Sequence, residues 1–179
     1  MPRWLICLVA ALLAGPVSAA DVTALEVVDF GLYRARTIGH QDAPLAVNGQ
    51  TKTIADIEFY QTTARVPARI GIRFGTRFRI VGTPPRQSVR LRSVWRIPDP
   101  GIRNPDSGRL YRQSISEFTS IIGGLHMRGF SFGSSWQIAC GEWIQEVWFG
   151  GRKLLSQTFT VEDCQAVPTA ARRAAAPAG

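Results

Sequence analysis

One serine in this sequence stands in a pattern that hydrolases use for a nucleophile. Ser131 is the central residue of Gly129-Phe130-Ser131-Phe132-Gly133, which matches G-x-S-x-G. In that motif the serine sits on a strand-to-helix turn and is followed along the chain by an acid and then a histidine. Because no histidine follows Ser131, the segment is better explained as a strand whose glycines mark turns or bulges. A serine hydrolase using Ser131 is retained as the alternative from the enzyme class.

Arginines form a second notable pattern. The chain has 21 Lys and Arg against 13 Asp and Glu, a formal net charge of +8. In two consecutive predicted strands, alternate residues place arginines on one face and apolar side chains on the other. The arginines of this candidate anion-binding face are Arg69, Arg73, Arg77, Arg79, Arg90, Arg92 and Arg96.

This face has two interpretations. It could bind a polyanion such as lipopolysaccharide or an acidic glycan. Alternatively, it is a solvated surface whose arginines are neutralised by Glu142 and Glu146 and stacked on Trp148, and the sequence favours this second interpretation. We expect weak, salt-sensitive polyanion binding and no specific nucleic-acid partner.

The two arginine strands could pair directly or lie in different sheets. Direct pairing would set like charges opposite one another, which is destabilising. In a sandwich, consecutive strands often belong to different sheets, and this would separate the two sets. The pairs that direct pairing would create are Arg79 with Arg90, Arg77 with Arg92 and Arg73 with Arg96.

Two pairs of carboxylates also have strand-face spacing. They are Asp56 with Glu58 and Glu142 with Glu146. Acid–base chemistry by such pairs requires burial that separates their pKa values. An outward face near arginines is the expected location, so we predict no catalytic residue among them.

Residues 1–20 have the features of a secretory signal peptide. Arg3 precedes an apolar run, and Val17-Ser18-Ala19-Ala20 supplies small residues for cleavage near Ala19 or Ala20. The apolar run is shorter than the roughly 20 residues of a bilayer-spanning helix. We therefore expect a periplasmic or secreted protein without a transmembrane anchor.

Removal of the signal would leave two cysteines, Cys140 and Cys164. Disulfides persist in oxidising compartments, so we predict a bridge between them. His40 and His126 do not lie at ligand-like spacings from these thiols. We predict no metal site and, because phosphate-binding and calcium-binding loops do not occur in the sequence, no cofactor.

The remaining chain shows short alternating runs separated by turn residues, which is typical of an all-β fold. We predict a single antiparallel β-sandwich, immunoglobulin-like, over residues 21–165, with about seven or eight strands. Residues 37–53 and 98–109 are predicted loops, and residues 166–179 a disordered Ala/Pro/Arg tail. The predicted strands are 23–34, 55–65, 69–81, 88–97, 110–118, 127–133, 142–149 and 153–161.

The last two strands define a hairpin with a specific register. Apolar residues share one face of each strand, so an odd-length loop, Gly150-Gly151-Arg152, is required to match them. This register places Trp143 opposite Phe159, Val147 opposite Leu155, and Gln145 opposite Gln157. We expect the two glutamine amides to be hydrogen-bond partners, because buried polar groups need one.

Several short motifs, in this order, resemble a family. They are Asp29-Phe30-Gly31-Leu32-Tyr33, Thr62-Thr63 with Val66-Pro67, Phe74-Gly75, Gly82 with Pro84, Gly141 with Trp143, and Leu154, Gln157 and Phe159-Thr160-Val161. Together they resemble an uncharacterised bacterial domain-of-unknown-function family of short exported proteins, over about Val22 to Val161. The resemblance implies an exported all-β domain and assigns no catalytic or binding residue. We expect a non-enzymatic binding or accessory module of the cell envelope, whose partner is an envelope protein or a glycan.

Overall fold

The computed structural model describes residues 19–164. The predicted signal peptide, apart from Ala19 and Ala20, lies outside the described residues, as does the predicted tail of residues 166–179. Within the described range no helix combines the length and apolar character needed to cross a bilayer.

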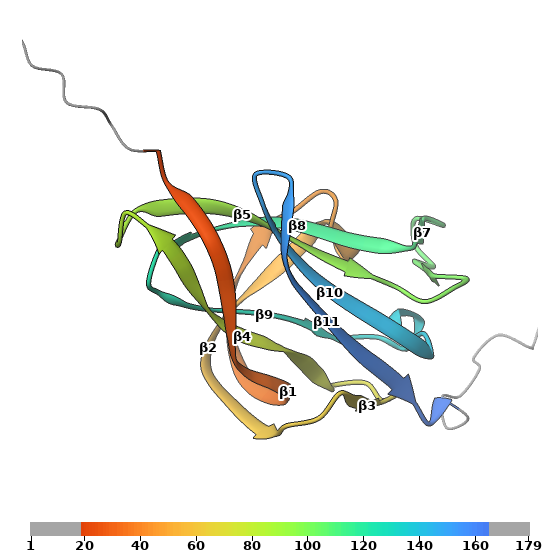
Figure 1. Ribbon diagram of the computed structural model, residues 1–179. Coiled ribbons are helices and arrows are strands. Elements are labelled where there is room, and N and C mark those ends of the chain that lie inside the picture. Colours follow the sequence, from red (N-terminus) through yellow and green to blue (C-terminus); the bar gives the residue numbers. More distant parts are fainter. Residues whose placement is uncertain (1–18, 165–179) are drawn as a thin grey trace, which may run out of the picture.

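Two sheets packed face to face form the domain (Figure 1). Sheet A contains, in spatial order, β2 (Gln50–Gln61), β1 (Asp21–Asp42), β4 (Arg73–Thr83) and β9 (Leu125–Ser131). Sheet B contains β3 (Arg65–Pro67), β11 (Arg152–Glu162), β10 (Gly141–Phe149), β5 (Ser88–Arg96) and β8 (Gln113–Ile121). The remaining elements are the short pair β6 (Ile102–Arg103) and β7 (Leu110–Tyr111) and the 3-10 turns η1 (Val47–Gly49) and η2 (Ser135–Gln137).

The predicted β-sandwich is therefore confirmed, with one exception to its antiparallel pairing. The short strand β3 pairs with β11 in parallel, and every other strand pair among the described residues is antiparallel. The strands are also more numerous than predicted, because short segments such as β3, β6 and β7 pair locally.

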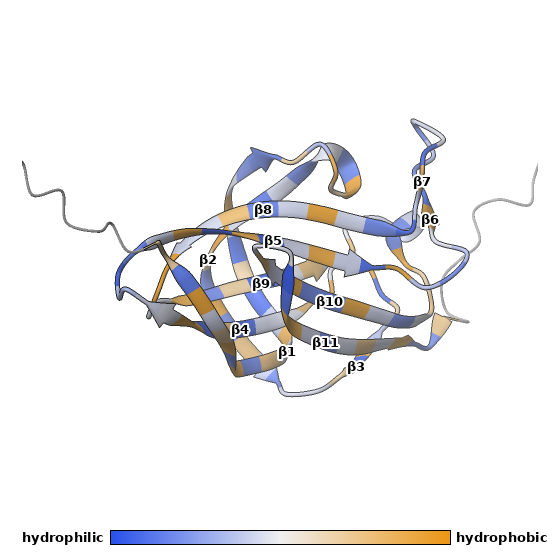
Figure 2. Cartoon of the chain, turned by 45° about the horizontal axis from the view of Figure 1, so that its top comes forward, coloured by the Kyte–Doolittle hydropathy of each residue, from blue (hydrophilic) through white to orange (hydrophobic). Residues whose placement is uncertain are grey.

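Alternation along the strands builds the core between the sheets (Figure 2). Phe74 of sheet A lies against Trp95 and Phe159 of sheet B, with ring centroids 5.3 Å apart in each pair. Trp143 and Phe78 are also fully buried. These aromatic rings interlock the two inner faces and contribute much of the buried apolar area.

The arginine strands belong to different sheets, which was one of the two alternatives. β4 lies in sheet A and β5 in sheet B, so the like-charged pairs of a direct hairpin do not form. The predicted strand 69–81 also begins too early, because Arg69 to Ile72 form a turn in which Gly71 has a φ of +89°. As a result Ile70, expected to point into the core, is 56% exposed.

The predicted loop 37–53 is wrong. β1 continues to Asp42 and pairs with β2 from Leu32 onward, whereas its first half pairs with β4. The two strands form a long hairpin whose tip crosses to sheet B. There the Ile115 N–H donates to the Leu45 carbonyl over 3.0 Å, and the Val47 N–H donates to Ser114 Oγ over 3.0 Å.

The β10–β11 hairpin has the predicted register, with Trp143 opposite Phe159, Val147 opposite Leu155 and Gln145 opposite Gln157. Its loop differs from the prediction. Gly150 and Gly151, both at positive φ, form a two-residue turn, and an irregularity between Val147 and Trp148 supplies the extra residue.

The two glutamines of that hairpin do not bond to each other. Thr76 Oγ donates to Gln145 Oε1 over 2.9 Å, and Gln145 Nε2 donates to the Arg128 carbonyl over 2.9 Å. Gln157 Nε2 instead donates to the Thr158 carbonyl beside it. Gln145 is thus a buried polar link from sheet B to two strands of sheet A.

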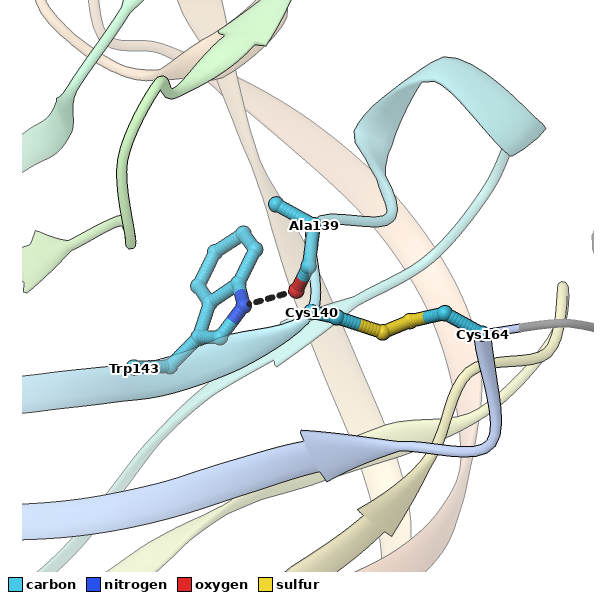
Figure 3. The surroundings of a disulfide bond; sticks show 4 residues. All are labelled: Ala139, Cys140, Trp143 and Cys164. Carbon is cyan, nitrogen blue, oxygen red and sulfur yellow. Dashed lines mark hydrogen bonds between the residues drawn. A yellow bond between two sulfur atoms is a disulfide. The ribbon is translucent and has the colours of Figure 1, made fainter.

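Cys140 and Cys164 form a disulfide beside the start of β10 and the end of β11 (Figure 3). Their Cα atoms lie 6.1 Å apart, within the usual range for a bridge. Next to it, Trp143 Nε1 donates to the Ala139 carbonyl over 2.8 Å. The bridge and this hydrogen bond fasten the open end of the hairpin.

Candidate functional site

A pocket of about 210 Å³ lies where the β1–β2 hairpin passes the edge of β9 and reaches β8. The edges of sheets A and B meet the hairpin tip at this place, so three separate parts of the chain contribute walls. Among its charged and hydroxyl-bearing side chains are Tyr33, Lys52, Arg73, Ser114, Ser116, Arg128 and Ser131.

The charges of this pocket are all positive. Lys52, Arg73 and Arg128 line it, and no aspartate or glutamate does so among the described residues. None of these three cations forms a salt bridge within residues 19–164. Positive charge without a protein counter-ion makes the pocket attractive to anions.

Arg128 is the most enclosed of the three. It comes from β9, and its guanidinium donates to Ser116 Oγ on β8 over 2.6 Å and lies 4.9 Å from the centre of the Phe118 ring. Burial lowers the pKa of Arg128 to about 10, so the side chain stays charged at neutral pH. A fixed guanidinium with further N–H groups to offer is a good ligand for a planar or tetrahedral anion.

Lys52 reaches the same pocket from β2. Its Nζ donates to Ser131 Oγ over 3.2 Å. Partial burial lowers the pKa of Lys52, and the neighbouring Arg73 lowers it further. Arg73 itself donates to Thr37 Oγ over 3.2 Å. The mutual repulsion of Lys52 and Arg73 is the kind that a bound anion relieves.

Tyr33 lies in the same pocket and interacts electrostatically with both of its arginines. Burial raises the pKa of Tyr33 to about 12, although both Arg73 and Arg128 act to lower it. The phenol is therefore a neutral hydroxyl within electrostatic reach of two guanidinium groups. It fits because Gly129 has no side chain: a Cβ there would lie 2.6 Å from the Tyr33 hydroxyl oxygen.

Three serine hydroxyls in the pocket already accept a hydrogen bond. Ser114 accepts from the Val47 N–H, Ser116 from Arg128, and Ser131 from Lys52. A hydroxyl that accepts from a fixed donor still has its own proton to donate. Each of these serines can therefore still donate one hydrogen bond to a ligand in the pocket.

Ser131, the residue of the nucleophile-like motif, lies in this pocket at the end of β9, which is followed by the short 3-10 turn η2 and not by an α-helix. The nearby amides that could stabilise an oxyanion are engaged, since those of Gly133 and Ser134 both donate to Gln137 Oε1, over 2.7 and 3.1 Å. Sequence patterns alone indicated no base for Ser131, whereas the structure brings Lys52 to it.

The predicted arginine face is divided. Arg73 lines the pocket, and Arg77 pairs with Asp29 over 3.2 Å on sheet A. On the outer side of sheet B, Arg90 and Arg92 both pair with Glu117, and Arg96 pairs with Glu146 over 3.1 Å. Arg69 and Arg79 are exposed. Carboxylates thus neutralise four of these arginines. Glu117, which was not among the predicted counter-ions, pairs with two of the four.

Glu146 corrects the prediction for its carboxylate pair. It lies on the outer side of sheet B near an arginine, as expected, but its carboxylate is buried beneath its partners and the residue is only 3% exposed. Burial alone would raise its pKa, but hydrogen bonds from Arg96, Trp148 and Lys153 hold the pKa of Glu146 below its usual value. Lys153, rather than an arginine, lies over the Trp148 ring at 5.8 Å. Glu142 remains exposed and forms no ion pair among the described residues.

The other predicted carboxylate pair makes no site either. Asp56 is exposed and pairs with Arg36 across the β1–β2 hairpin over 2.8 Å. Glu58 is exposed as well. No group of three or more histidine, cysteine or acidic side chains able to hold a metal occurs in the part of the chain that the structure describes.

Sequence reasoning missed Tyr33, Lys52 and Arg128 as pocket residues. Lys52 lies inside the predicted loop, although Thr51-Lys52-Thr53-Ile54 contains the β-branched residues that favour strands. Arg128 alternates with His126 and Phe130, whose rings pack against the opposite sheet, and this alternation was the available signal. A charge at a core-facing position of a strand calls for a partner or a function.

Comparison with solved structures supports the architecture. The chain is 21% identical to an immunoglobulin-like protein from Pseudomonas aeruginosa, with a TM-score of 0.50, covering 83% of this chain and all of the other. A second match is an alkylpurine DNA glycosylase, AlkC, from Pseudomonas fluorescens bound to DNA with an abasic site analog. Its values are 17% identity, a TM-score of 0.37, and coverage of 56% of this chain and 28% of that one.

The first likeness shows an immunoglobulin-like β-sandwich, as predicted, and the second carries no weight. No curated protein sequence matches the chain. The family described as Domain of unknown function (DUF3859) matches residues 21–161, which cover the whole sandwich from β1 into β11. The chain is a member of that family.

Proposed function

We propose that this domain is a non-enzymatic binding module of the bacterial cell envelope, and that its pocket binds an anionic group of the ligand. The observation that carries the proposal is the set of three cations, Lys52, Arg73 and Arg128, in a pocket whose described lining has no carboxylate. Binding sites of this kind combine a concave surface with a few convergent polar groups.

Two features of the chain support a location outside the cytoplasm. The first is the signal-like composition of residues 1–20. The second is the Cys140–Cys164 disulfide, which is favoured in an oxidising compartment. Envelope proteins and glycans are accordingly the proposed partners, and many envelope glycans and lipids carry anionic groups.

Thermal unfolding in the presence of anions tests the proposal. A ligand at about 100 times its Kd stabilises the folded state by about 2.7 kcal/mol, which corresponds to about 5–10 °C in Tm for a domain of this size. We expect inorganic phosphate and sulfate to raise Tm at constant ionic strength. Potassium chloride at the same ionic strength serves as the reference.

Two variants that each remove one positive charge distinguish anion binding in the pocket from a general effect of the protein's net charge. Lys52→Gln should reduce the anion-dependent rise in Tm, because it removes a donor from the pocket. Arg92→Gln, on the outer side of sheet B, should leave the rise unchanged. An equal response in the wild type and both variants would contradict the proposal.

One observation favours a second candidate function, a hydrolase with a serine–lysine pair. Lys52 Nζ lies 3.2 Å from Ser131 Oγ, and the pKa of Lys52 is lowered by burial and by Arg73. A neutral lysine can act as the base for a serine nucleophile. The engaged amides of Gly133 and Ser134 argue against it, since neither is free to bind an oxyanion. Labelling of the wild type, but not of Ser131→Ala, by a fluorophosphonate probe would establish this alternative.

A further inference from the structure

We infer that the anionic group recognised by the pocket is a phosphate monoester. This inference rests on the proposed function and narrows it to one ligand class. It is drawn from the kind, number and charge of the groups that line the pocket.

The hydrogen-bond capacity of the pocket favours a phosphate. Ser114, Ser116 and Ser131 each accept from a protein donor and still have their own proton to donate. Lys52 and Arg128 add N–H donors beyond those already used. A ligand that bonds to several of these donors needs several lone pairs, and a phosphate monoester offers three terminal oxygens where a carboxylate has two.

The charge of the pocket favours the same group. Three cations line it without a carboxylate among the described residues. A phosphate monoester carries about −1.5 to −2 charges at pH 7, so it neutralises about half to two-thirds of the excess. A carboxylate or a phosphodiester carries one negative charge and would leave two cations uncompensated.

The size of the pocket favours a terminal group. Sites that enclose a whole small-molecule ligand usually measure about 300–1,000 Å³, and this pocket measures about 210 Å³. It can enclose a terminal group but not a large ligand. A phosphodiester in a polymer backbone continues on both sides of the phosphorus, which fits a small pocket poorly. A terminal phosphate on a sugar or on a lipid headgroup fits better.

Calorimetric titration with three aryl anions tests the inference. Phenyl phosphate, phenyl sulfate and benzoate share the same ring and differ in the anionic group. At pH 7.5 and constant ionic strength, we expect phenyl phosphate to bind at least about tenfold more tightly than benzoate, since one added charge-assisted hydrogen bond corresponds to about that factor in Kd. Glucose 6-phosphate and short-chain phosphatidic acid then distinguish a sugar source from a lipid source.

Variants locate the binding. Arg128→Gln should weaken phenyl phosphate binding by about tenfold or more, because it removes a charge-assisted donor. Because Arg128 is partly buried and this variant could fail to fold, Lys52→Gln provides a second test on an exposed side chain. Arg92→Gln is the control with the same charge change and should bind as the wild type does.

The possible results distinguish the proposed anion-binding pocket from the narrower inference that its ligand is a phosphate monoester. Equal binding of benzoate or phenyl sulfate and phenyl phosphate would overturn the phosphate inference while leaving an anion-binding pocket in place. Absence of binding by every anion in folded wild-type protein would overturn both. Phenyl phosphate binding that Lys52→Gln and Arg92→Gln weaken equally would place the ligand elsewhere and overturn the inference.

Discussion

Replacement of Gln145 by leucine should destabilise the domain strongly, although the two side chains have similar volumes. Gln145 is fully buried, accepts from Thr76 Oγ and donates to the Arg128 carbonyl. Leucine would leave that hydroxyl and that carbonyl without these partners, in the interior between the sheets. At about 1–3 kcal/mol for each unsatisfied buried group, the loss is about 2–6 kcal/mol. This is a large part of the roughly 5–15 kcal/mol of a typical domain.

Urea unfolding followed by tryptophan fluorescence measures this loss. With a slope of about 2 kcal/mol per molar urea, the midpoint should fall by about 1–3 M. Gln157→Leu is the matched control, since the same substitution at the opposing residue of the hairpin removes only a local bond to Thr158. Its effect should remain within about 0.5 kcal/mol, as for most surface changes.

A double-mutant cycle tests the assigned cause. Thr76→Val removes the hydroxyl that Gln145→Leu leaves unsatisfied, so the double variant should be more stable than the sum of the two single losses implies. Strict additivity, or a Gln145→Leu midpoint within error of the wild type, would refute the reasoning that this side chain links the sheets.

The disulfide, the acid stability and the outer arginines give three further predictions. Replacing Cys140 and Cys164 by alanine should cost about 3.5 kcal/mol in the chain-entropy model, given their separation of 24 residues; an unchanged urea midpoint would contradict it. Burial lowers the pKa of His126 to about 4, so the unfolded chain binds more protons between about pH 6.5 and 4 and stability falls as pH drops through that window. His126→Phe should flatten this part of the profile in urea titrations, and a profile parallel to that of the wild type would be evidence against it. Heparin should be retained weakly and released below about 0.5 M salt, with little change in Arg77→Ala combined with Arg79→Ala; retention above that concentration would indicate a dedicated polyanion site.

Much of the sandwich was predictable from alternation alone. The inward positions of Phe74, Phe78 and Trp95, and the pairing of Trp143 with Phe159, follow from matching apolar faces, because a shift of one residue would expose them. The division of the arginine strands between sheets was one of two open alternatives, since local sequence does not decide which strands pair.

The pocket was not predictable in the same way. The β1–β2 hairpin is polar on much of its surface because it extends beyond the core, so its strands lack the apolar alternation that marked the others. The predicted partner of Gln145 was also wrong: the hairpin register was correct, yet the amide turns across the sandwich to Thr76. Contacts between sheets depend on the packing of segments far apart in the chain. The meeting of Lys52 with Ser131 is of this kind.

The most direct test of the anion pocket is a crystal structure of the protein grown with tungstate, a heavy tetrahedral oxyanion that is visible by its anomalous scattering. We predict an anomalous peak in the pocket, within hydrogen-bond distance of the Arg128 guanidinium and of Lys52 Nζ, and its absence in Lys52→Gln crystals grown in the same way. An empty pocket with peaks only at exposed arginines such as Arg79 or Arg92 would contradict the proposed site.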